Sequence, residues 1–250
     1  MKSIRSPFQR FLASIFFSLA LAVAPPHALA VLTYLAPGQP DSSILLAPPP
    51  LPGSPEQSAD MAEVVAVFHV TTTNEADAAF SEKKFSIFNF TPAIGTFFQP
   101  GKFPQTEAFF ERLQKDAAAA TDAAKDFWKR PRPYTVDPTL ASGKLEKSFG
   151  YPSGHSTEGT VLALLLAELF PDKRDDILAV GRNIGWHRVE IARHYPTDIY
   201  AGRVFAQAIV RELKSNPAFQ CDFAEAKREI EAAKAVPQTA AIPQQTAVAN

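Results

Sequence analysis

Apolar residues recur at the spacing of one helix face through most of this chain, and no segment alternates as a strand does. The clearest repeat runs from about residue 105 to residue 128, and Pro131 and Pro133 follow it as helix stops. The inner face of that repeat consists of Phe109, Phe110, Leu113, Ala117 and Ala120. A chain with this periodicity and no strand signal is predicted to fold as an all-α, single-domain helical bundle.

The same spacing predicts further helices on both sides of this repeat. An earlier helix face consists of Met61, Val64, Val65 and Phe68. Residues 160–170 are apolar almost all round, which indicates a helix buried on every side. Pro171 is expected to open the next helix, and Pro196 to interrupt the pattern before another one. A last helix is expected from about residue 217 to 235, and residues 134–151 are expected to form a loop.

The N-terminus has the pattern of a secretory signal peptide. Lys2, Arg5 and Arg10 precede an apolar run over residues 11–24, and Ala28-Leu29-Ala30 fits the small-residue cleavage site. The run is short for a membrane span, which needs about 20 apolar residues. We therefore expect removal of residues 1–30 near Ala30 and a periplasmic or secreted protein.

The rest of the chain divides by composition. Residues 31–56 are rich in proline, which predicts a helix-free arm extended over the surface. Residues 57–235 are expected to form the helical domain, and the uncharged residues 236–250 a disordered tail. The prolines of the arm are Pro37, Pro40, Pro48, Pro49, Pro50, Pro52 and Pro55.

Charge and cysteine content exclude several classes of function. Removing residues 1–30 takes three basic residues and no acidic one, so the formal net charge falls from −1 to −4 and nucleic acid is not an expected partner. Cys221 is the single cysteine, so no internal disulfide forms; a half-buried packing role is expected for it, with an intermolecular bridge as the alternative. Neither HExxH nor a His/Cys cluster is present, so no metal site is predicted.

Two blocks carry groups that suit an anion. Lys125 lies in the last helical turn of the long repeat, and Arg132 lies just beyond it between two prolines that stiffen the backbone. Pro152-Ser153-Gly154-His155 precedes the buried helix, where free N–H groups and a hydroxyl meet an anion. Taken alone, the first block also reads as a basic helix end and the second as an ordinary N-cap.

A third block combines Arg188, His194 and Asp198. The aspartate falls in the first turn of a helix, from which it can reach the imidazole. A carboxylate on Nδ1–H leaves Nε2 with a free lone pair, as a nucleophile or base requires. A capping aspartate beside a structural histidine is the alternative for this block alone.

In this order, Lys-x6-Arg-Pro, Pro-Ser-Gly-His and Arg-x5-His-x3-Asp resemble the signature of the type 2 phosphatidic acid phosphatase superfamily. Within it the chain is most similar to bacterial class A non-specific acid phosphatases, from the signal peptide to about Leu213. The resemblance implies a helical bundle of the acid phosphatase and vanadium haloperoxidase type. It also implies a metal-independent acid phosphatase without cofactor that hydrolyses small-molecule phosphomonoesters.

The resemblance also implies roles for individual residues. His194 would attack phosphorus and become a phosphohistidine, Asp198 would orient it, and His155 would protonate the leaving alcohol and then activate water. The non-bridging oxygens would be held by Lys125, Arg132, Ser153, Gly154 and Arg188. These cations suit a transition state that chiefly needs positioning and charge stabilisation.

One position departs from the pattern, because His187 stands where members usually have serine. Its side chain should point about 100° away from that of Arg188 on the helix. We expect it to steady the Arg188 segment through a ring-nitrogen hydrogen bond, whereas a protonated anion donor is the rival interpretation.

Three other classes share some of these features. A vanadium-dependent haloperoxidase has the same motifs, although this chain is short for that group. A lipid phosphate or pyrophosphate phosphatase embeds them among membrane spans, which the mature chain is not expected to contain. A phosphate-binding protein would not need both histidines. The preferred phosphoester, the balance of hydrolysis and transfer, and the oligomeric state, a homo-oligomer included, stay open.

Overall fold

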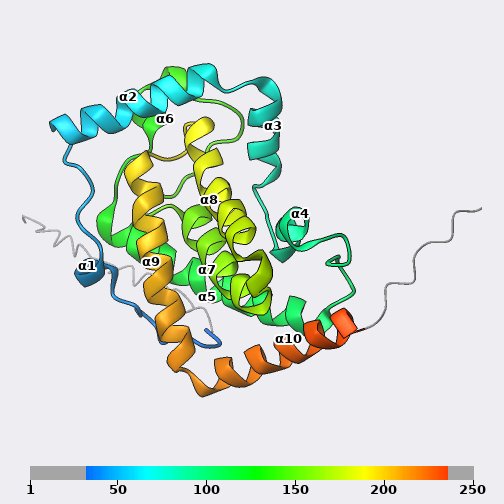
Figure 1. Ribbon diagram of the computed structural model, residues 1–250. Coiled ribbons are helices and arrows are strands. Elements are labelled where there is room, and N and C mark those ends of the chain that lie inside the picture. Colours follow the sequence, from blue (N-terminus) through cyan, green and yellow to red (C-terminus); the bar gives the residue numbers. More distant parts are fainter. Residues whose placement is uncertain (1–31, 236–250) are drawn as a thin grey trace, which may run out of the picture. The chain divides into compact units, whose positions relative to one another are not determined.

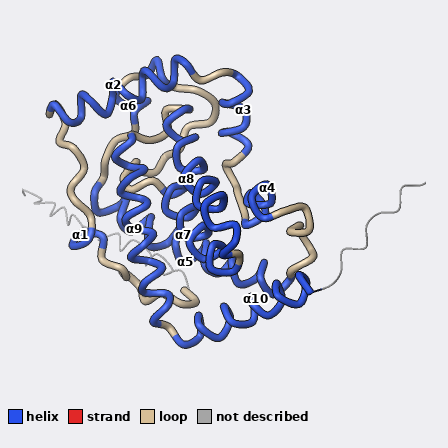
Figure 2. The backbone as a smooth tube through the Cα atoms, viewed as in Figure 1, coloured by secondary structure: helices blue, strands red, loops and turns tan. Residues whose placement is uncertain are grey.

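The computed structural model describes residues 32–235, and within them it holds helices, turns and loops but no strand (Figure 2). The all-α prediction is therefore confirmed. The α-helices are α1 (Ser42–Leu45), α2 (Pro55–Val70), α3 (Thr73–Ser81), α4 (Thr91–Ile94), α5 (Pro104–Trp128), α6 (Pro133–Val136), α7 (Gly154–Leu169), α8 (Arg174–Glu190), α9 (Pro196–Ser215) and α10 (Pro217–Ala235). Short 3₁₀ turns cover Ile87–Phe90, Pro138–Leu140 and Pro171–Lys173.

Helix α7 lies at the centre of the bundle, as its apolar composition predicts (Figure 1). It packs against α5, α8 and α9 and buries leucines on several sides. Glycines allow the close approach: a Cβ on Gly202 of α9 would lie 2.8 Å from the Ser153 carbonyl oxygen, and one on Gly181 of α8 2.5 Å from Ala163. This contact holds the start of α7 against α9.

Helices α2 and α10 lie at opposite ends of the helical bundle (Figure 1). Helix α2 contacts α8 and α9, whereas α10 contacts α5 and α9. A second apolar cluster, which includes Val64, Val189, Tyr195 and Ile199, lies under α2. Residues before the matched motifs therefore help to build the surroundings of the motif residues.

The proline-rich segment differs from its prediction, because it contains α1 and enters the core. Tyr34, Leu35 and Leu46 are buried. The buried carboxylate of Asp116 on α5 accepts hydrogen bonds from the backbone N–H groups of Thr33, Tyr34 and Leu35, at 2.9, 2.7 and 3.1 Å. Backbone groups paired in this way can be buried, which proline content alone does not reveal.

Several boundaries also differ from the sequence analysis. The buried helix begins at Gly154, six residues before the apolar run of residues 160–170, because Ser153 caps it and its first turn is polar. Helix α2 begins at Pro55, capped by Ser54, and lies partly in the predicted arm. Helices α3 and α4 were not predicted, and α6 with the 3₁₀ turn Pro138–Leu140 lies in the predicted loop.

The predicted signal peptide, residues 1–30, and the predicted tail, residues 236–250, lie outside the described residues. In residues 32–235, none of the helices combines the length and the apolar character that crossing a bilayer requires. Cys221 is exposed, so the packing role expected for it is wrong.

Candidate active site

His194 and Asp198 meet where α8 gives way to α9. His194 Nδ1 lies 3.2 Å from Asp198 Oδ2, which also accepts the Tyr195 N–H at 3.0 Å. On its other side, His194 Nε2 lies 3.1 Å from Arg132 Nη1. A carboxylate only accepts and a guanidinium only donates, so both partners favour the tautomer with hydrogen on Nδ1. Burial, together with the charges of Arg132 and Lys125, lowers the pKa of His194 well below its usual value, so the ring is neutral.

A buried ion-pair chain supports Asp198 from behind. Arg130 Nη1 donates to Asp198 Oδ1 at 2.6 Å, and Arg130 Nη2 donates to Asp60 Oδ2 of α2 at 2.7 Å. The Arg130 guanidinium also lies over the Tyr195 ring, 4.1 Å from its centroid. Burial raises the pKa of Asp198 to about 6, against the lowering effect of Arg130. Asp198 is therefore charged at neutral pH.

His155 lies in the first turn of α7 and faces α3 and the chain after it. Its Nε2 lies 3.1 Å from the Glu82 carbonyl oxygen, and its ring packs on Phe85. Because a carbonyl only accepts, Nε2 carries hydrogen and Nδ1 has the lone pair. Burial, and then the Arg188 charge, lowers the pKa of His155 to about 3 against the raising effect of the Glu82 bond.

His187 contacts the same residue from another side, since its Nδ1 lies 2.8 Å from Glu82 Oε2. The Glu82 hydrogen bond raises the pKa of His187. Glu82 thus connects His187 to His155 through its own carboxylate and carbonyl. The expected ring-nitrogen hydrogen bond is present. Its partner, Glu82, contacts His155 and does not belong to the Arg188 segment.

Lys125, Arg132 and Arg188 come from different elements and are all buried. Lys125 Nζ lies beside Gly154, since a Cβ there would lie 3.3 Å from it. Burial, and then the Arg132 charge, lowers the pKa of Lys125. Burial lowers the pKa of Arg188 to about 10, so this group keeps its charge. A single carboxylate, that of Glu146, lies 2.7 Å from Arg188 Nη2 and 3.5 Å from Arg132 Nη1.

The turn before α7 is fixed by α9. Ser153 N donates to the Asp198 carbonyl oxygen at 3.0 Å, which ties the turn to the residue that holds His194. The Ser153 hydroxyl accepts the Ser156 N–H at 3.4 Å. Because the first N–H groups of a helix have no partner within it, the amide of Gly154 is placed to meet an anion beside Lys125.

The motif residues therefore gather around one point. Sequence analysis did not identify Arg130, Asp60, Glu82, Glu146 or Arg193 as part of this site. Arg130 lies among the unspecified positions between Lys125 and Arg132, and Arg193 among those between Arg188 and His194, so the motifs do not mark either residue. Asp60 and Glu82 lie far from the motifs in the chain, and no spacing rule marks them.

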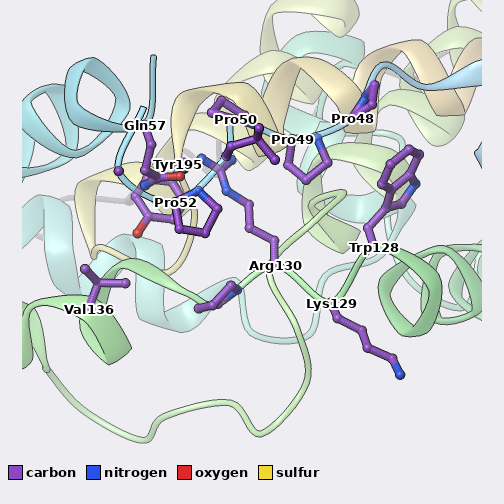
Figure 3. A pocket seen from close by; sticks show the side chains of 13 residues that line it. Pro48, Pro49, Pro50, Pro52, Gln57, Trp128, Lys129, Arg130, Val136 and Tyr195 are labelled. Carbon is purple, nitrogen blue, oxygen red and sulfur yellow. Dashed lines mark hydrogen bonds between the residues drawn. The ribbon is translucent and has the colours of Figure 1, made fainter. Parts of the chain in front are cut away.

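Two pockets adjoin these residues. One, of about 670 Å³, is lined by Phe80, Lys83, Arg188, Arg193 and residues 143–148, and it opens onto Glu146. The other, shown in Figure 3, is mainly apolar and lies between the proline-rich segment and the end of α5. There the Arg130 side chain reaches toward Gln57 and Tyr195, and Lys129 points away. None of the motif residues lines this second pocket. The first is therefore the candidate substrate entrance.

Residues 32–235 contain no group of three His, Cys, Asp or Glu side chains that could hold a metal ion.

Comparisons with known proteins agree with this constellation. A model of the PAP2 superfamily matches residues 117–217, which include every motif residue. An acid phosphatase from Zymomonas mobilis is 29% identical over 206 residues, covering 78% of this chain and 77% of its own. A non-specific acid phosphatase from Providencia stuartii is 32% identical, covering 76% and 80%, and one from Salmonella typhimurium is 28% identical with the same coverage. The chain belongs to the PAP2 superfamily, in which these relatives are acid phosphatases.

Proposed function

We propose that this phosphatase of the PAP2 superfamily is an exported, metal-independent acid phosphatase that hydrolyses phosphomonoesters through a phosphohistidine at His194. The observation that carries the proposal is the fixed tautomer of His194, with Nδ1–H on Asp198 and the Nε2 lone pair on the side of Arg132. A neutral, oriented imidazole among buried cations is equipped to attack phosphorus.

In the first step, a phosphate oxygen replaces His194 Nε2 as the acceptor of the Arg132 Nη1–H hydrogen bond, and the lone pair on Nε2 becomes free. Nε2 then forms a bond to phosphorus while the bond from phosphorus to the ester oxygen breaks. With substrate bound, His155 takes up a proton from solvent at Nδ1 and gives that proton to the leaving alkoxide. Bound phosphate brings negative charge beside this ring and opposes the lowering of its pKa by burial and by Arg188.

In the second step, His155 takes a proton from water as the water oxygen attacks phosphorus and the bond to Nε2 breaks. Lys125, Arg132, Arg188, the Ser153 hydroxyl and the Gly154 amide hold the non-bridging oxygens in both steps. These fixed charges supply the electrostatic stabilisation that a loose phosphoryl-transfer transition state requires.

Export rests on the sequence of residues 1–30 and on the bacterial acid phosphatases that the chain resembles. Sequencing the N-terminus of protein recovered from the periplasm or medium tests it. We expect the mature chain to begin near Val31, and a cytoplasmic protein that keeps residues 1–30 would contradict export.

The catalytic proposal is tested with purified mature protein on phosphomonoesters, a phosphodiester and a lipid phosphate, with and without EDTA. We expect monoester hydrolysis that survives EDTA and is inhibited by vanadate, which mimics the trigonal-bipyramidal transition state. His194→Ala should abolish turnover and the acid-labile phosphoenzyme together. Loss of activity in EDTA with recovery on zinc or magnesium would contradict metal independence, and a phosphoenzyme in His194→Ala would contradict the nucleophile.

A further inference from the structure

Glu146 lies between several cations of the phosphate site, in a position that the motifs do not describe. Its Oε1 lies 2.7 Å from Arg188 Nη2, and its Oε2 lies 3.5 Å from Arg132 Nη1 and 3.2 Å from Arg193 Nε. Each of these arginines is buried. Two of them are the residues proposed to hold the phosphoryl oxygens, so carboxylate and phosphate cannot both occupy this place.

The carboxylate satisfies these cations only in part. Its Oε2 is buried and accepts no hydrogen bond of good geometry, and Arg188 Nε is also buried without a partner among the described residues. The nearest carboxylate to Lys125 Nζ is that of Asp122, at 3.8 Å. A phosphoryl group has three non-bridging oxygens and can accept more hydrogens here than two carboxylate oxygens do. Phosphate is therefore the better ligand for the same cations.

We propose that Glu146 sets the affinity of this site, because its carboxylate contacts the same arginines, Arg132 and Arg188, that would hold the phosphoryl oxygens, and substrate binds by displacing it. This inference rests on the proposed function for the location of the phosphate site. It makes Glu146 a built-in competitor, so every anion that binds must first replace its contacts with Arg132, Arg188 and Arg193.

The loop that carries Glu146 can release the side chain without refolding. Its backbone is held near Glu146 by the Tyr134 hydroxyl, which donates to the Glu146 carbonyl oxygen at 2.9 Å, and near Ser148 by Arg132 Nε at 2.8 Å. Arg193 donates to the carbonyl oxygens of Ser142 and Lys144. The Glu146 side chain is itself 30% exposed and lines the pocket of about 670 Å³. Rotation about its side-chain bonds into that pocket clears the phosphate position.

Arg193 adds a third cation to the contacts of the Glu146 carboxylate. It directly precedes His194 but is not one of the motif positions. Its guanidinium is fixed over the Phe80 and Tyr134 rings, 5.6 and 5.3 Å from their centroids. A fixed third arginine holds Glu146 more firmly than the two motif arginines alone.

The test compares the binding of inorganic phosphate to the full mature protein by titration calorimetry for the wild type, E146Q and E146D. Loss of the competing charge should tighten phosphate binding by roughly fivefold to tenfold in E146Q, as expected for one partly exposed charge pair. The vanadate Ki and the substrate KM should fall by the same factor, because all three ligands displace the same group. E146D keeps the charge on a shorter side chain and should fall between the two.

The control is E111Q, which removes an equal charge from an exposed position on α5. It should bind phosphate as the wild type does, and an equal gain in E111Q would assign the effect to net charge and overturn the proposal. Unchanged or weaker phosphate binding in E146Q and E146D would overturn it as well. Phosphate should also raise the Tm of E146Q more than that of the wild type. This shift measures phosphate affinity even if E146Q is less stable than the wild type. Failure of the wild type to hydrolyse monoesters would instead contradict the proposed function, because phosphate binding is measured without turnover.

Discussion

At the scale of single residues, the most informative group is His155, whose pKa is lowered to about 3 while an unfolded histidine titrates near its usual 6.5. The unfolded chain therefore binds more protons than the folded one below about pH 6.5, so His155 reduces stability as the pH falls. We predict that the unfolding free energy of the wild type, relative to His155→Asn, decreases by on the order of 1 kcal/mol per pH unit between pH 6 and 4. Denaturant unfolding across that range measures it. Equal pH slopes for both proteins would show that the ring is not held neutral, and saturating phosphate should reduce the slope because the anion favours the protonated ring.

Some residues of the candidate site could be predicted from the sequence, and others could not. The motif positions were found from the sequence, and the structure places their side chains together because α7, α8 and α9 pack through glycines such as Gly181 and Gly202. Glu82 was not found, since its contact with His155 uses a backbone carbonyl that every residue has. Glu146 was not found either, because its neighbours Arg132, Arg188 and Arg193 come from two segments that lie far from each other in the chain. Only tertiary structure identifies such groups.

At the scale of elements, α2 is joined to the site through the Asp60 carboxylate. This group accepts hydrogen bonds from Arg130 Nη2 at 2.7 Å, from the Thr197 N–H at 3.3 Å and from the Thr197 hydroxyl. Asp60 is not among the residues proposed to hold phosphate, so its effect should pass through Arg130 and Asp198. We predict that Asp60→Asn lowers kcat by about tenfold, corresponding to about 1.4 kcal/mol, with little change in KM. Steady-state kinetics with thermal unfolding tests this, and Glu63→Gln, at an exposed position of the same helix, should change neither. A rise in KM alone would show that Asp60 acts on substrate binding.

The long helices were predicted from the sequence, whereas the single-turn helices were missed. Helix α5 extends over many turns, so its periodicity defined it within a residue or two of the observed bounds, and α10 also has the bounds expected for the last helix. Helices α1 and α4 are single turns and have no period to detect. Helix α3 is defined mainly by its capping box, in which Thr72 and Glu75 satisfy each other's backbone N–H groups. Its hydrophobic face is too short to stand out from the sequence.

At the scale of the whole molecule, the first described residues form hydrogen bonds with helices α5 and α10. Asp116 of α5 accepts three backbone N–H groups of residues 33–35, and Tyr34 donates its hydroxyl to Asp222 of α10 at 2.6 Å. Arg112 completes this contact, with Nε 2.8 Å from the Tyr34 hydroxyl and Nη2 2.8 Å from Asp222. The segment that was expected to lie extended on the surface thus joins α5 to α10. Its contribution should be to stability and not to chemistry, because no motif residue takes part.

Asp116→Asn tests this division between stability and chemistry. An amide has one acceptor oxygen and presents donors to N–H groups that need acceptors, so at least one buried N–H loses its partner. We predict a loss of about 2 kcal/mol in unfolding free energy, and a Tm lower by several degrees, while kcat at 25 °C stays within twofold of the wild type. Thermal unfolding and steady-state kinetics on the same preparations measure both quantities. Asp126→Asn, at an exposed position nearer the end of the same helix, is the matched control and should leave the Tm unchanged. A large fall in kcat for folded Asp116→Asn would mean that the N-terminal segment shapes the active site as well as stabilising the bundle.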